Sequence, residues 1–456
     1  MLRKVTLASV VGATIAATGP AAGADDAQVQ QIHEEIKALK DGYEARIRQL
    51  EERLDQAQRP GADAGAAPAP AAPAAAANAF NPAISLILGG QYNNLQRDPD
   101  TYQIGGFIPG GDEIGPGSRS FNLGESELDI SANVDPYFSG LFALALNSDN
   151  EAEVEEAYVQ NTGSISGLTV KFGRMLSGFG YLNEFHAHAW DFADAPLIHQ
   201  AFFGGQLRED GLQARWLAPT PVFLELGAEA GRGAAFPGSD RDKNGLNSAM
   251  LFVHVGDDIG DSHSYRVGAS YRVTEAQDRS YEDLDAAGSP VTDAFTGDSR
   301  MWGLDFVWKW APGGNPVDRN FKLQGEYMHR VEDGSLAFDT GGANLSGPYR
   351  SSQSGWYLQG VYQFVARWRA GLRFEELYSG DTAIGLADNG TLPAADFPAL
   401  AQNNPRRATL MVDFSPSEFS RLRLQFARDE ARFNEADNQV FLQYIMSLGS
   451  HGAHKF

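Results

Sequence analysis

The last stretch of the chain, residues 440–456, alternates between apolar and other side chains with a period of two. The even positions from Val440 to Leu448 are all apolar, whereas the odd positions include Gln443. This alternation is typical of a β-strand with one apolar face, because successive side chains of a strand point to opposite faces. The chain ends on an aromatic residue, Phe456, which has the parity of that apolar face.

The same alternation recurs from Phe80 onward and divides the chain into sixteen segments. Short connections, such as 219–221 and 365–366, alternate with long ones, such as 275–299 and 331–353. Short turns on one rim and long loops on the other are typical of transmembrane β-barrels, whose strands alternate between lipid-facing and lumen-facing side chains. The sixteen segments are 84–92, 128–134, 142–146, 157–159, 170–172, 212–218, 222–228, 249–255, 265–271, 302–310, 321–327, 356–364, 368–374, 408–414, 422–426 and 440–448.

These features predict an all-β fold, a 16-stranded antiparallel transmembrane β-barrel over residues 80–456. An even number of strands places both ends of the barrel on the same side of the membrane. Trp302 and Trp310 lie on one face of a segment, about 26 Å apart along a strand that rises about 3.3 Å per residue. On strands tilted by about 40°, this is about 20 Å along the membrane normal, close to the height of the apolar band of such barrels. A soluble β-sandwich is the alternative, but its outward face is polar.

Residues 1–24 have the organisation of a secretory signal peptide. Two basic residues, Arg3 and Lys4, precede an apolar run, and Ala22-Gly23-Ala24 supplies a small-residue cleavage site. A membrane-anchoring helix is the alternative, which the shortness of the apolar run disfavours. The sequence therefore predicts export from the cytoplasm.

Residues 25–57 carry apolar side chains three or four positions apart, with one stutter, among charged residues. This spacing predicts an α-helical coiled coil in the periplasm, and a single helix cannot bury such a seam. We therefore expect self-association, most naturally as a homotrimer held by the coiled coil and the barrel walls. A single amphipathic helix lying on another surface is the alternative. Residues 58–79 are rich in Ala and Pro and predict an extended linker between the helix and the barrel.

The composition limits the chemistry available to the chain. Its 456 residues include no cysteine, which excludes disulfides, thiolate metal sites and cysteine catalysis. Lys and Arg number 36 against 59 Asp and Glu, a formal net charge of −23, so nucleic acid is not expected as a partner. No segment after the leader has the long apolar run of a transmembrane helix, a test that barrel strands evade. Outer-membrane lipid is the partner that the alternating strands predict.

Parity assigns the remaining side chains of each segment to the lumen, where opposite charges are segregated. The early segments carry carboxylates and the later ones carry arginines. Opposed walls of this kind produce a transverse electric field across a water-filled pore. The alternative is that the lumen is polar only because it is wet, and these residues leave the net ion selectivity undecided. The predicted pore-lining residues are Glu125, Glu127, Asp129, Lys171, Arg369, Arg373, Arg421 and Arg423.

The loop at 174–207 combines histidine, aspartate and aromatic residues. It follows the fifth segment, and we expect it to fold into the barrel and constrict the pore. Imidazole and carboxylate groups can bind Zn²⁺ or a similar divalent ion, with His186 and His188 as the candidate ligands. The alternative is a structural role in which the histidines form hydrogen bonds with the barrel wall. The predicted residues of the constriction loop are His186, His188, Asp191, Asp194 and His199.

Several strings in the sequence resemble a known family. The run KFGR at 171–174, followed by a glycine-aromatic turn and an acidic-aromatic loop, resembles the phosphate-selective porin O/P-like superfamily. The strings FNLGESELDIS, GYLNEFHAHAWDFADAPL and QYIMSLGSHGAHKF resemble a narrower group, described either as porins or as zinc-regulated, TonB-associated receptors. The resemblance implies an outer-membrane barrel over residues 80–456, and Phe456 implies recognition by the barrel-assembly machinery. Phosphate specificity is not carried over, because the lumen offers arginines and few lysines.

Other motifs in the sequence give little information about function. Asp240 to Gly245 match the first half of a calcium-binding loop, but position twelve is Leu251, where a bidentate Glu is required, so a turn is the simpler interpretation. No catalytic constellation emerges, and neither enzymatic activity nor a cofactor is expected. The sequence predicts a porin for passive diffusion of small hydrophilic solutes or ions. The alternatives are a TonB-associated receptor for metal ions or metal chelates, although no plug-sized segment precedes the first strand, and a tether within the cell envelope.

Overall fold

A computed structural model describes residues 82–111, 114–147, 151–162 and 166–449. The predicted signal peptide, coiled coil and linker, together with His451, His454 and Phe456, lie outside the described residues. Among the residues that the structure does describe, no helix is both long enough and apolar enough to cross a membrane.

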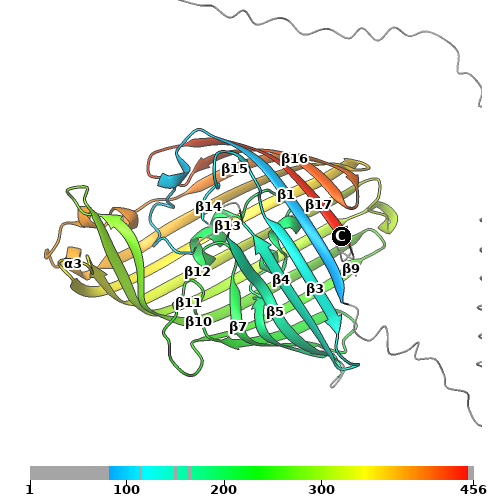
Figure 1. Ribbon diagram of the computed structural model, residues 1–456, viewed down its shortest axis with the longest axis horizontal. Helices are drawn as coiled ribbons and strands as arrows, with labels where there is room; N and C mark the ends of the chain where they lie inside the picture. The colour runs from blue at the N-terminus through cyan, green and yellow to red at the C-terminus, as the bar shows by residue number, and fades with distance from the viewer. Residues whose placement is uncertain (1–81, 112–113, 148–150, 163–165, 450–456) are drawn as a thin grey trace, which may run out of the picture. The chain divides into compact units, whose positions relative to one another are not determined.

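The described chain forms one antiparallel sheet that closes on itself (Figure 1). Strand β1 (Ala83–Leu95) pairs with β17 (Asp437–Gly449) along one edge and with β2 (Ser120–Asn122) and β3 (Ser126–Asn133) along the other. Because β2 pairs with one end of β1 and β3 with the opposite end, the two are halves of a single strand interrupted at 123–125. The seventeen segments of the sheet therefore form sixteen barrel strands, which confirms the predicted barrel and its strand count.

The other strands follow in chain order, and each pairs with the next. They are β4 (Phe138–Leu146), β5 (Ala152–Thr162), β6 (Leu168–Leu176), β7 (Arg208–Leu217), β8 (Phe223–Gly231), β9 (Ser248–Ile259), β10 (His263–Leu284), β11 (Pro290–Trp310), β12 (Asn320–Phe338), β13 (Leu345–Val365), β14 (Trp368–Ile384), β15 (Arg406–Ser417) and β16 (Ser420–Glu430). The helices are short and lie in the connections: η1 (Pro99–Thr101), η2 (Leu182–Glu184), η3 (Ala187–Ala189), α2 (Leu197–Phe203), η4 (Pro312–Gly314), α3 (Gly385–Asp388), η5 (Ala394–Asp396) and η6 (Pro398–Leu400).

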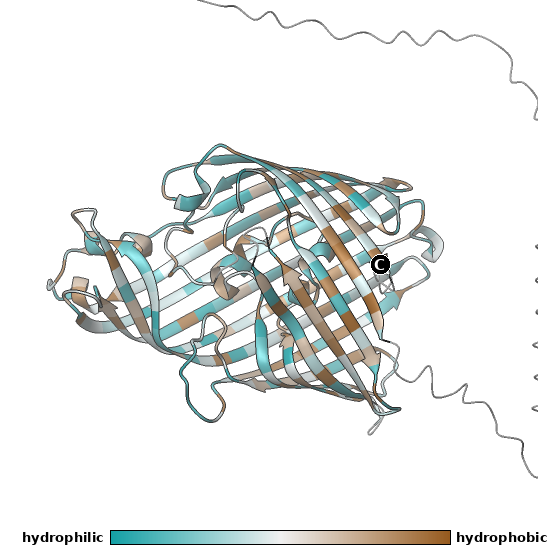
Figure 2. Cartoon of the chain, in the orientation of Figure 1, coloured by the Kyte–Doolittle hydropathy of each residue, from teal (hydrophilic) through white to brown (hydrophobic). Residues whose placement is uncertain are grey.

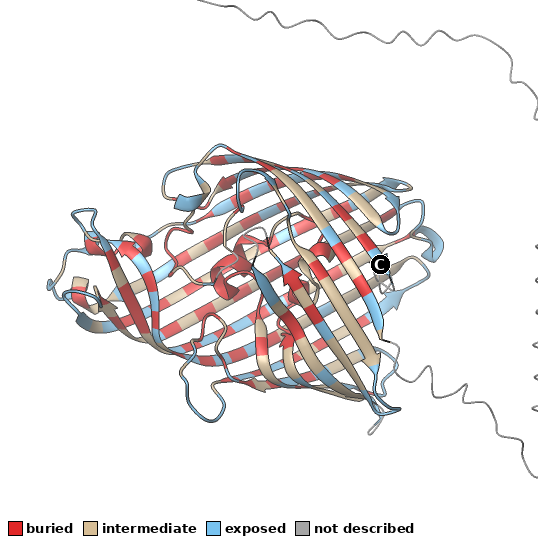
Figure 3. Ribbon diagram, viewed as in Figure 1, coloured by how far each residue is buried: buried red, intermediate tan, exposed pale blue. Residues whose placement is uncertain are grey.

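Large apolar side chains cover the outside of the barrel. Leu251, Leu304 and Leu372 are more than half exposed, and each lies between buried neighbours on its strand. The exposed and buried residues alternate along the strands (Figure 3), and apolar residues recur on them (Figure 2). An exterior of this kind is stable against lipid and unfavourable against water, because the hydrophobic effect opposes so much exposed apolar surface.

Strands β10 to β13 are longer than predicted, and this corrects the expected loops at 275–299 and 331–353. Most of both ranges is strand, and the connections that remain are 285–289 and 339–344. The reason is that the apolar outward face ends there: exposed positions of these extensions, such as Glu275 and Arg300, carry polar side chains. The buried inward positions carry both apolar side chains and charged ones, such as Asp293 and Glu332. The inward residues Tyr281, Val291, Phe295, Leu336, Phe338 and Tyr349 form a buried cluster with Phe397, Ala399 and Leu400 from the connection after β14.

Candidate functional site

Residues 177–207, here called the inserted loop, lie inside the barrel. The loop leaves β6 and returns to β7, and every residue of its helix α2 is buried. Leu197, Ile198 and Phe202 pack against inward-facing side chains of five strands, and the segment between β1 and β2 covers the same cluster. The strand residues of this cluster are Met250, Phe252, Met301, Met328, Tyr357 and Leu377, and the covering residues are Ile104 and Phe107. An apolar core therefore holds the loop across the lumen.

The end of α2 is closely packed against the segment between β1 and β2. Gly204 ends the helix in the left-handed conformation, with φ of 72°. A Cβ atom on Gly204 would lie 2.6 Å from the Cα atom of Gly111. Glycine is needed at position 204 both for the backbone angle and for this approach, because a side chain would strain the turn and clash with the neighbouring backbone.

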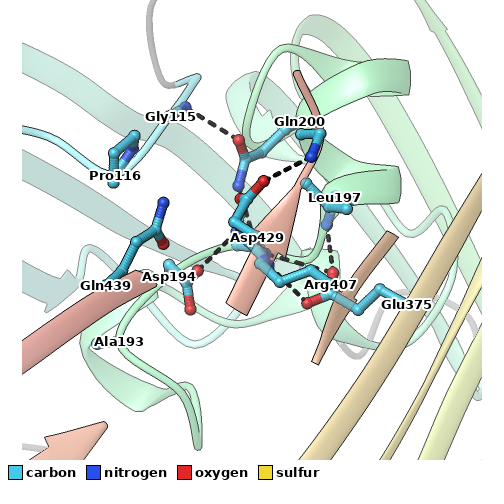
Figure 4. Close-up of polar contacts among 12 residues, drawn as sticks. Gly115, Pro116, Ala193, Asp194, Leu197, Gln200, Glu375, Arg407, Asp429 and Gln439 are labelled. Atoms are coloured by element: carbon cyan, nitrogen blue, oxygen red, sulfur yellow. Dashed lines mark hydrogen bonds and ion pairs between the residues drawn. The ribbon is translucent and has the colours of Figure 1, made fainter. Parts of the chain in front are cut away.

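One side of the inserted loop is held by what we call the basic wall, the inner face of β12 to β16. Asp191 pairs with Arg369 at 3.0 Å and with Lys322. Asp194 pairs with Arg373 and with Arg407, each at 2.8 Å. Figure 4 shows Asp194 beside Arg407. Loop carbonyls accept further hydrogen bonds from this wall: Trp190 O from Arg423, His188 O from Arg421 and Ala195 O from Arg407.

The basic wall also contains carboxylates that the sequence analysis did not single out. Glu326 Oε1 accepts hydrogen bonds from the backbone N–H groups of Tyr181 and Leu182, both at 2.7 Å, and its other oxygen lies 2.6 Å from His199 Nε2. Glu375 accepts from the N–H of Leu197, the first residue of α2. These glutamates have the same inward parity as the neighbouring Lys322 and Arg373, so the alternation contained the signal that would have found them.

The opposite side of the loop is held by what we call the acidic wall, the inner face of β3 and β5. His186 Nδ1 lies 2.8 Å from Glu155 Oε2 and 3.0 Å from Glu127 Oε1, and His186 Nε2 lies 3.0 Å from Glu156 Oε2. His188 Nδ1 lies 2.9 Å from the second oxygen of Glu127. Two loop histidines and three wall glutamates therefore form one largely buried cluster, in which His186 is 17% exposed.

A β-bulge in β5 turns Glu155 inward, which strict alternation with Glu156 does not predict. Ala143 on β4 pairs with Glu156, but the next residue, Leu144, pairs with Val154, so Glu155 is an extra residue on β5. A bulge re-aims side chains that strict alternation would place on opposite faces. Both Glu155 and Glu156 consequently point inward and are buried.

The remaining predicted pore-lining residues lie at the edges of these two walls. Glu125 lies in the break between β2 and β3, beside Glu127 and His188. Asp129 accepts a hydrogen bond from Ser85 at 3.1 Å. Lys171 on β6 lies over the ring of Tyr158, with its Nζ atom 4.2 Å from the centroid. The structure thus brings His186 and His188 together, and places Asp191, Asp194 and His199 against the basic wall. The acidic and basic walls do not face each other across open space, because the inserted loop lies between them.

The charge state of the loop residues follows from these partners. Burial alone would lower the pKa of His186, but the three glutamates around it outweigh burial and hold that pKa well above the ordinary value. Burial would raise the pKa of Asp194, but Arg373 and Arg407 lower it. The loop therefore presents positive charge to the acidic wall and negative charge to the basic wall.

Two cavities lie between the inserted loop and the rim where β1 begins and β17 ends. The first, of about 570 Å³, is lined by aromatic residues of the loop and by Lys309, Lys322, Arg369 and Arg421. The second, of about 660 Å³, has a mixed lining that includes Glu156, Lys171, Glu184 and Arg215. Both also touch turn residues at the rim, so the space beside the loop opens toward that end of the barrel.

The sequence and the fold were compared with known proteins. No family model matches the chain. A protein of Aquifex aeolicus (strain VF5), described as an uncharacterized protein, is 31% identical over 405 residues, which cover 83% of this chain and 80% of the relative. The chain belongs to the same family.

Solved structures with the same fold are outer-membrane proteins. A loop L8 deletion mutant of OmpT, an outer membrane protein of Vibrio cholerae, is 11% identical, with a TM-score of 0.50 over 81% of this chain and 100% of that one. The outer membrane channel DcaP of Acinetobacter baumannii is 15% identical, with a TM-score of 0.50 over 81% of this chain and 97% of that one. At these identities the likeness shows the fold, a porin-like barrel, which is the coarser part of the resemblance found in the sequence.

Proposed function

We propose that the protein is an outer-membrane channel through which small hydrophilic solutes diffuse passively, with the inserted loop as its constriction. The observation that carries this proposal is a closed barrel with an apolar exterior and a charged interior, crossed by a loop that leaves polar cavities at its sides. An apolar exterior suits lipid, and a charged interior suits water and polar solutes.

The solutes that suit the first cavity best are anions. Arg421 lines this cavity, and its neighbour Arg423 contacts the loop behind it. Within the described residues, neither arginine forms an ion pair with a carboxylate, whereas Arg369 is paired with both Asp191 and Asp413. Positive charge that the protein leaves uncompensated in a wet cavity raises the local concentration of anions. The aromatic residues Tyr181 and Trp190 in the same lining favour organic anions with an apolar body.

Planar-bilayer recording of the purified full-length protein tests this function. We expect stepwise channel openings and, in a salt gradient, a reversal potential on the anion-selective side. The double variant Arg421→Gln/Arg423→Gln removes both charges, retains an amide N–H donor at each position and should shift the reversal potential toward cation selectivity. Folded protein that inserts without forming openings would overturn the channel proposal, and an unchanged reversal potential in the double variant would overturn the anion pathway.

A homotrimer is the assembly that we propose for this channel. Support comes from the heptad-like spacing at 25–57, because a coiled coil requires partner helices. Cross-linking in detergent should trap trimers of the full-length protein. A variant that lacks residues 25–57 should form fewer trimers and retain channel openings, whereas a strictly monomeric full-length protein would contradict the proposal.

A further inference from the structure

The histidine–glutamate cluster on the acidic wall has the arrangement of a metal site. One oxygen or nitrogen atom from each of Glu127, Glu155 and His186 lies within 4.8 Å of the other two. Zn²⁺ bonds to nitrogen and oxygen at about 2.0–2.2 Å, so the ligand atoms of a tetrahedral site lie about 3.3–3.6 Å apart. The observed distances from His186 Nδ1 to the two glutamate oxygens, 2.8 and 3.0 Å, need only a small expansion to admit an ion.

The hydrogen bonding within the cluster is incomplete without a further positive group. One N–H bond at His186 Nδ1 cannot point at two carboxylates, and the hydrogen bond is directed to Glu155. Glu127 Oε1 accepts no hydrogen bond, although the Glu127 side chain is only 1% exposed. A buried carboxylate oxygen aimed at an imidazole nitrogen without a hydrogen between them is costly, and a cation between the two would stabilise both.

Each of these three residues also has an outer partner that fixes its orientation. His186 Nε2 faces Glu156, which itself accepts a hydrogen bond from the N–H of Leu176. Glu155 Oε1 accepts from Arg208 at 2.7 Å, and the second oxygen of Glu127 faces His188. Metal ligands in proteins are usually oriented by such a second layer, and a histidine ligand typically donates its other N–H to a carboxylate.

The backbone around the cluster is built to bring these groups together. The bulge in β5 turns Glu155 inward, and the break between β2 and β3 lets Glu125 approach. At that break Gly89 of β1 passes so close to the carbonyl of Glu125 that a Cβ atom would lie 2.3 Å from the oxygen. Two outer members of the cluster border the cavities, His188 the first and Glu156 the second.

We propose that Glu127, Glu155 and His186 bind one divalent transition-metal ion, which ties the inserted loop to the acidic wall. The donor set of one imidazole nitrogen and two carboxylate oxygens favours Zn²⁺ and similar first-row ions over Mg²⁺ or Ca²⁺, which prefer oxygen ligands alone. The ion has a structural role at the side of the channel and is not its transported solute, so this inference is independent of the proposed function.

Zinc titration of the full-length, chelator-treated protein by isothermal calorimetry tests the site. We expect one Zn²⁺ per chain, a loss of this binding in Glu127→Gln, and a 10- to 100-fold weaker affinity in Glu156→Gln, which removes only an outer partner. The matched control is His254→Gln, because His254 is buried and paired with Glu225 at 2.9 Å but belongs to no three-ligand group among the described residues.

Two outcomes would overturn the proposal. The first is a wild-type protein that binds no zinc. The second is equal binding by wild type and Glu127→Gln, which would place the ion at histidines elsewhere in the chain. Folding of Glu127→Gln is judged by its mobility in gels before and after heating. If this variant does not fold, Glu155→Gln is tested in its place. Undiminished zinc binding by Glu155→Gln would likewise overturn the proposal.

Discussion

The two walls of the lumen hold the same loop with different chemistry. On the basic wall, arginines bind the aspartates and backbone carbonyls of the loop directly, as Arg407 does with Asp194 and Ala195. On the acidic wall, glutamates bind the loop through the imidazoles of His186 and His188. Arginine is charged at every accessible pH, whereas imidazole is charged only when it binds a proton and otherwise can bind a metal ion.

This difference indicates that the loop is attached permanently to the basic wall and conditionally to the acidic wall. The basic wall provides a fixed attachment, and the acidic wall provides one that depends on what occupies the histidine–glutamate cluster. The opposite charges of the two walls also explain the composition of the loop, since histidines at its start and aspartates further on match the walls that they meet. Four predictions test this comparison.

The largest effect is expected from Asp194→Ala, which breaks the fixed attachment. The variant leaves Arg373 and Arg407 buried without one of their main partners, and breaking a buried pair costs about 3–5 kcal/mol. The loop should lose its attachment at position 194, although Asp191 and the apolar core still hold it elsewhere, and single-channel conductance should rise several-fold in planar bilayers. A folded variant with wild-type conductance would show that Asp194 does not hold the constriction.

A smaller effect is expected from His186→Ala, which breaks the attachment to the acidic wall. The lost hydrogen bonds to Glu155 and Glu156, with the lost ion pair to Glu127, cost about 1–3 kcal/mol, while the basic wall and the apolar core still hold the loop. The mean conductance should change little, and current fluctuations within open channels should increase. A conductance increase as large as that of Asp194→Ala would show that the two attachments are equivalent.

Addition of Zn²⁺ should sharpen the difference between the walls. In chelator-treated wild-type protein, micromolar Zn²⁺ should reduce the current fluctuations, because the ion joins the loop to the acidic wall. His186→Ala should show no response. The control Asp194→Ala should respond, since its histidine–glutamate cluster is intact. If His186→Ala responds to Zn²⁺ as strongly as wild type, the ion reduces the fluctuations by binding somewhere other than the histidine–glutamate cluster.

The smallest effect is expected from Asp240→Ala, the matched control for Asp194→Ala. Asp240 is also paired with an arginine, Arg232 at 2.5 Å, but both side chains are half exposed in an outer connection. Exposed ion pairs contribute little to stability because solvent screens them, so stability and conductance should match those of wild type. A destabilisation as large as that of Asp194→Ala would mean that burial does not determine how much these ion pairs contribute to stability.

The Asp240–Arg232 pair also gives a structural explanation for the calcium-like motif. In that motif Asp240 accepts a hydrogen bond from the N–H of Asp242, as in an ordinary turn.

The sequence alone determined the number, order and direction of the strands and the apolar exterior, because alternation with a period of two is a local property that each segment shows by itself. It also indicated which charges face inward, as at Glu127 and Arg373. These inferences required no knowledge of which segments pair.

Only the tertiary structure decided what those inward residues contact. The bulge at Glu155, the interrupted strand beside Glu125 and the extension of β10 beyond Thr274 all depend on pairing between neighbouring strands, which a single segment does not reveal. The match between loop histidines and acidic wall, and between loop aspartates and basic wall, requires the barrel to close around the loop. Charges far apart in the chain then share one low-dielectric interior, where each must find a partner of opposite charge.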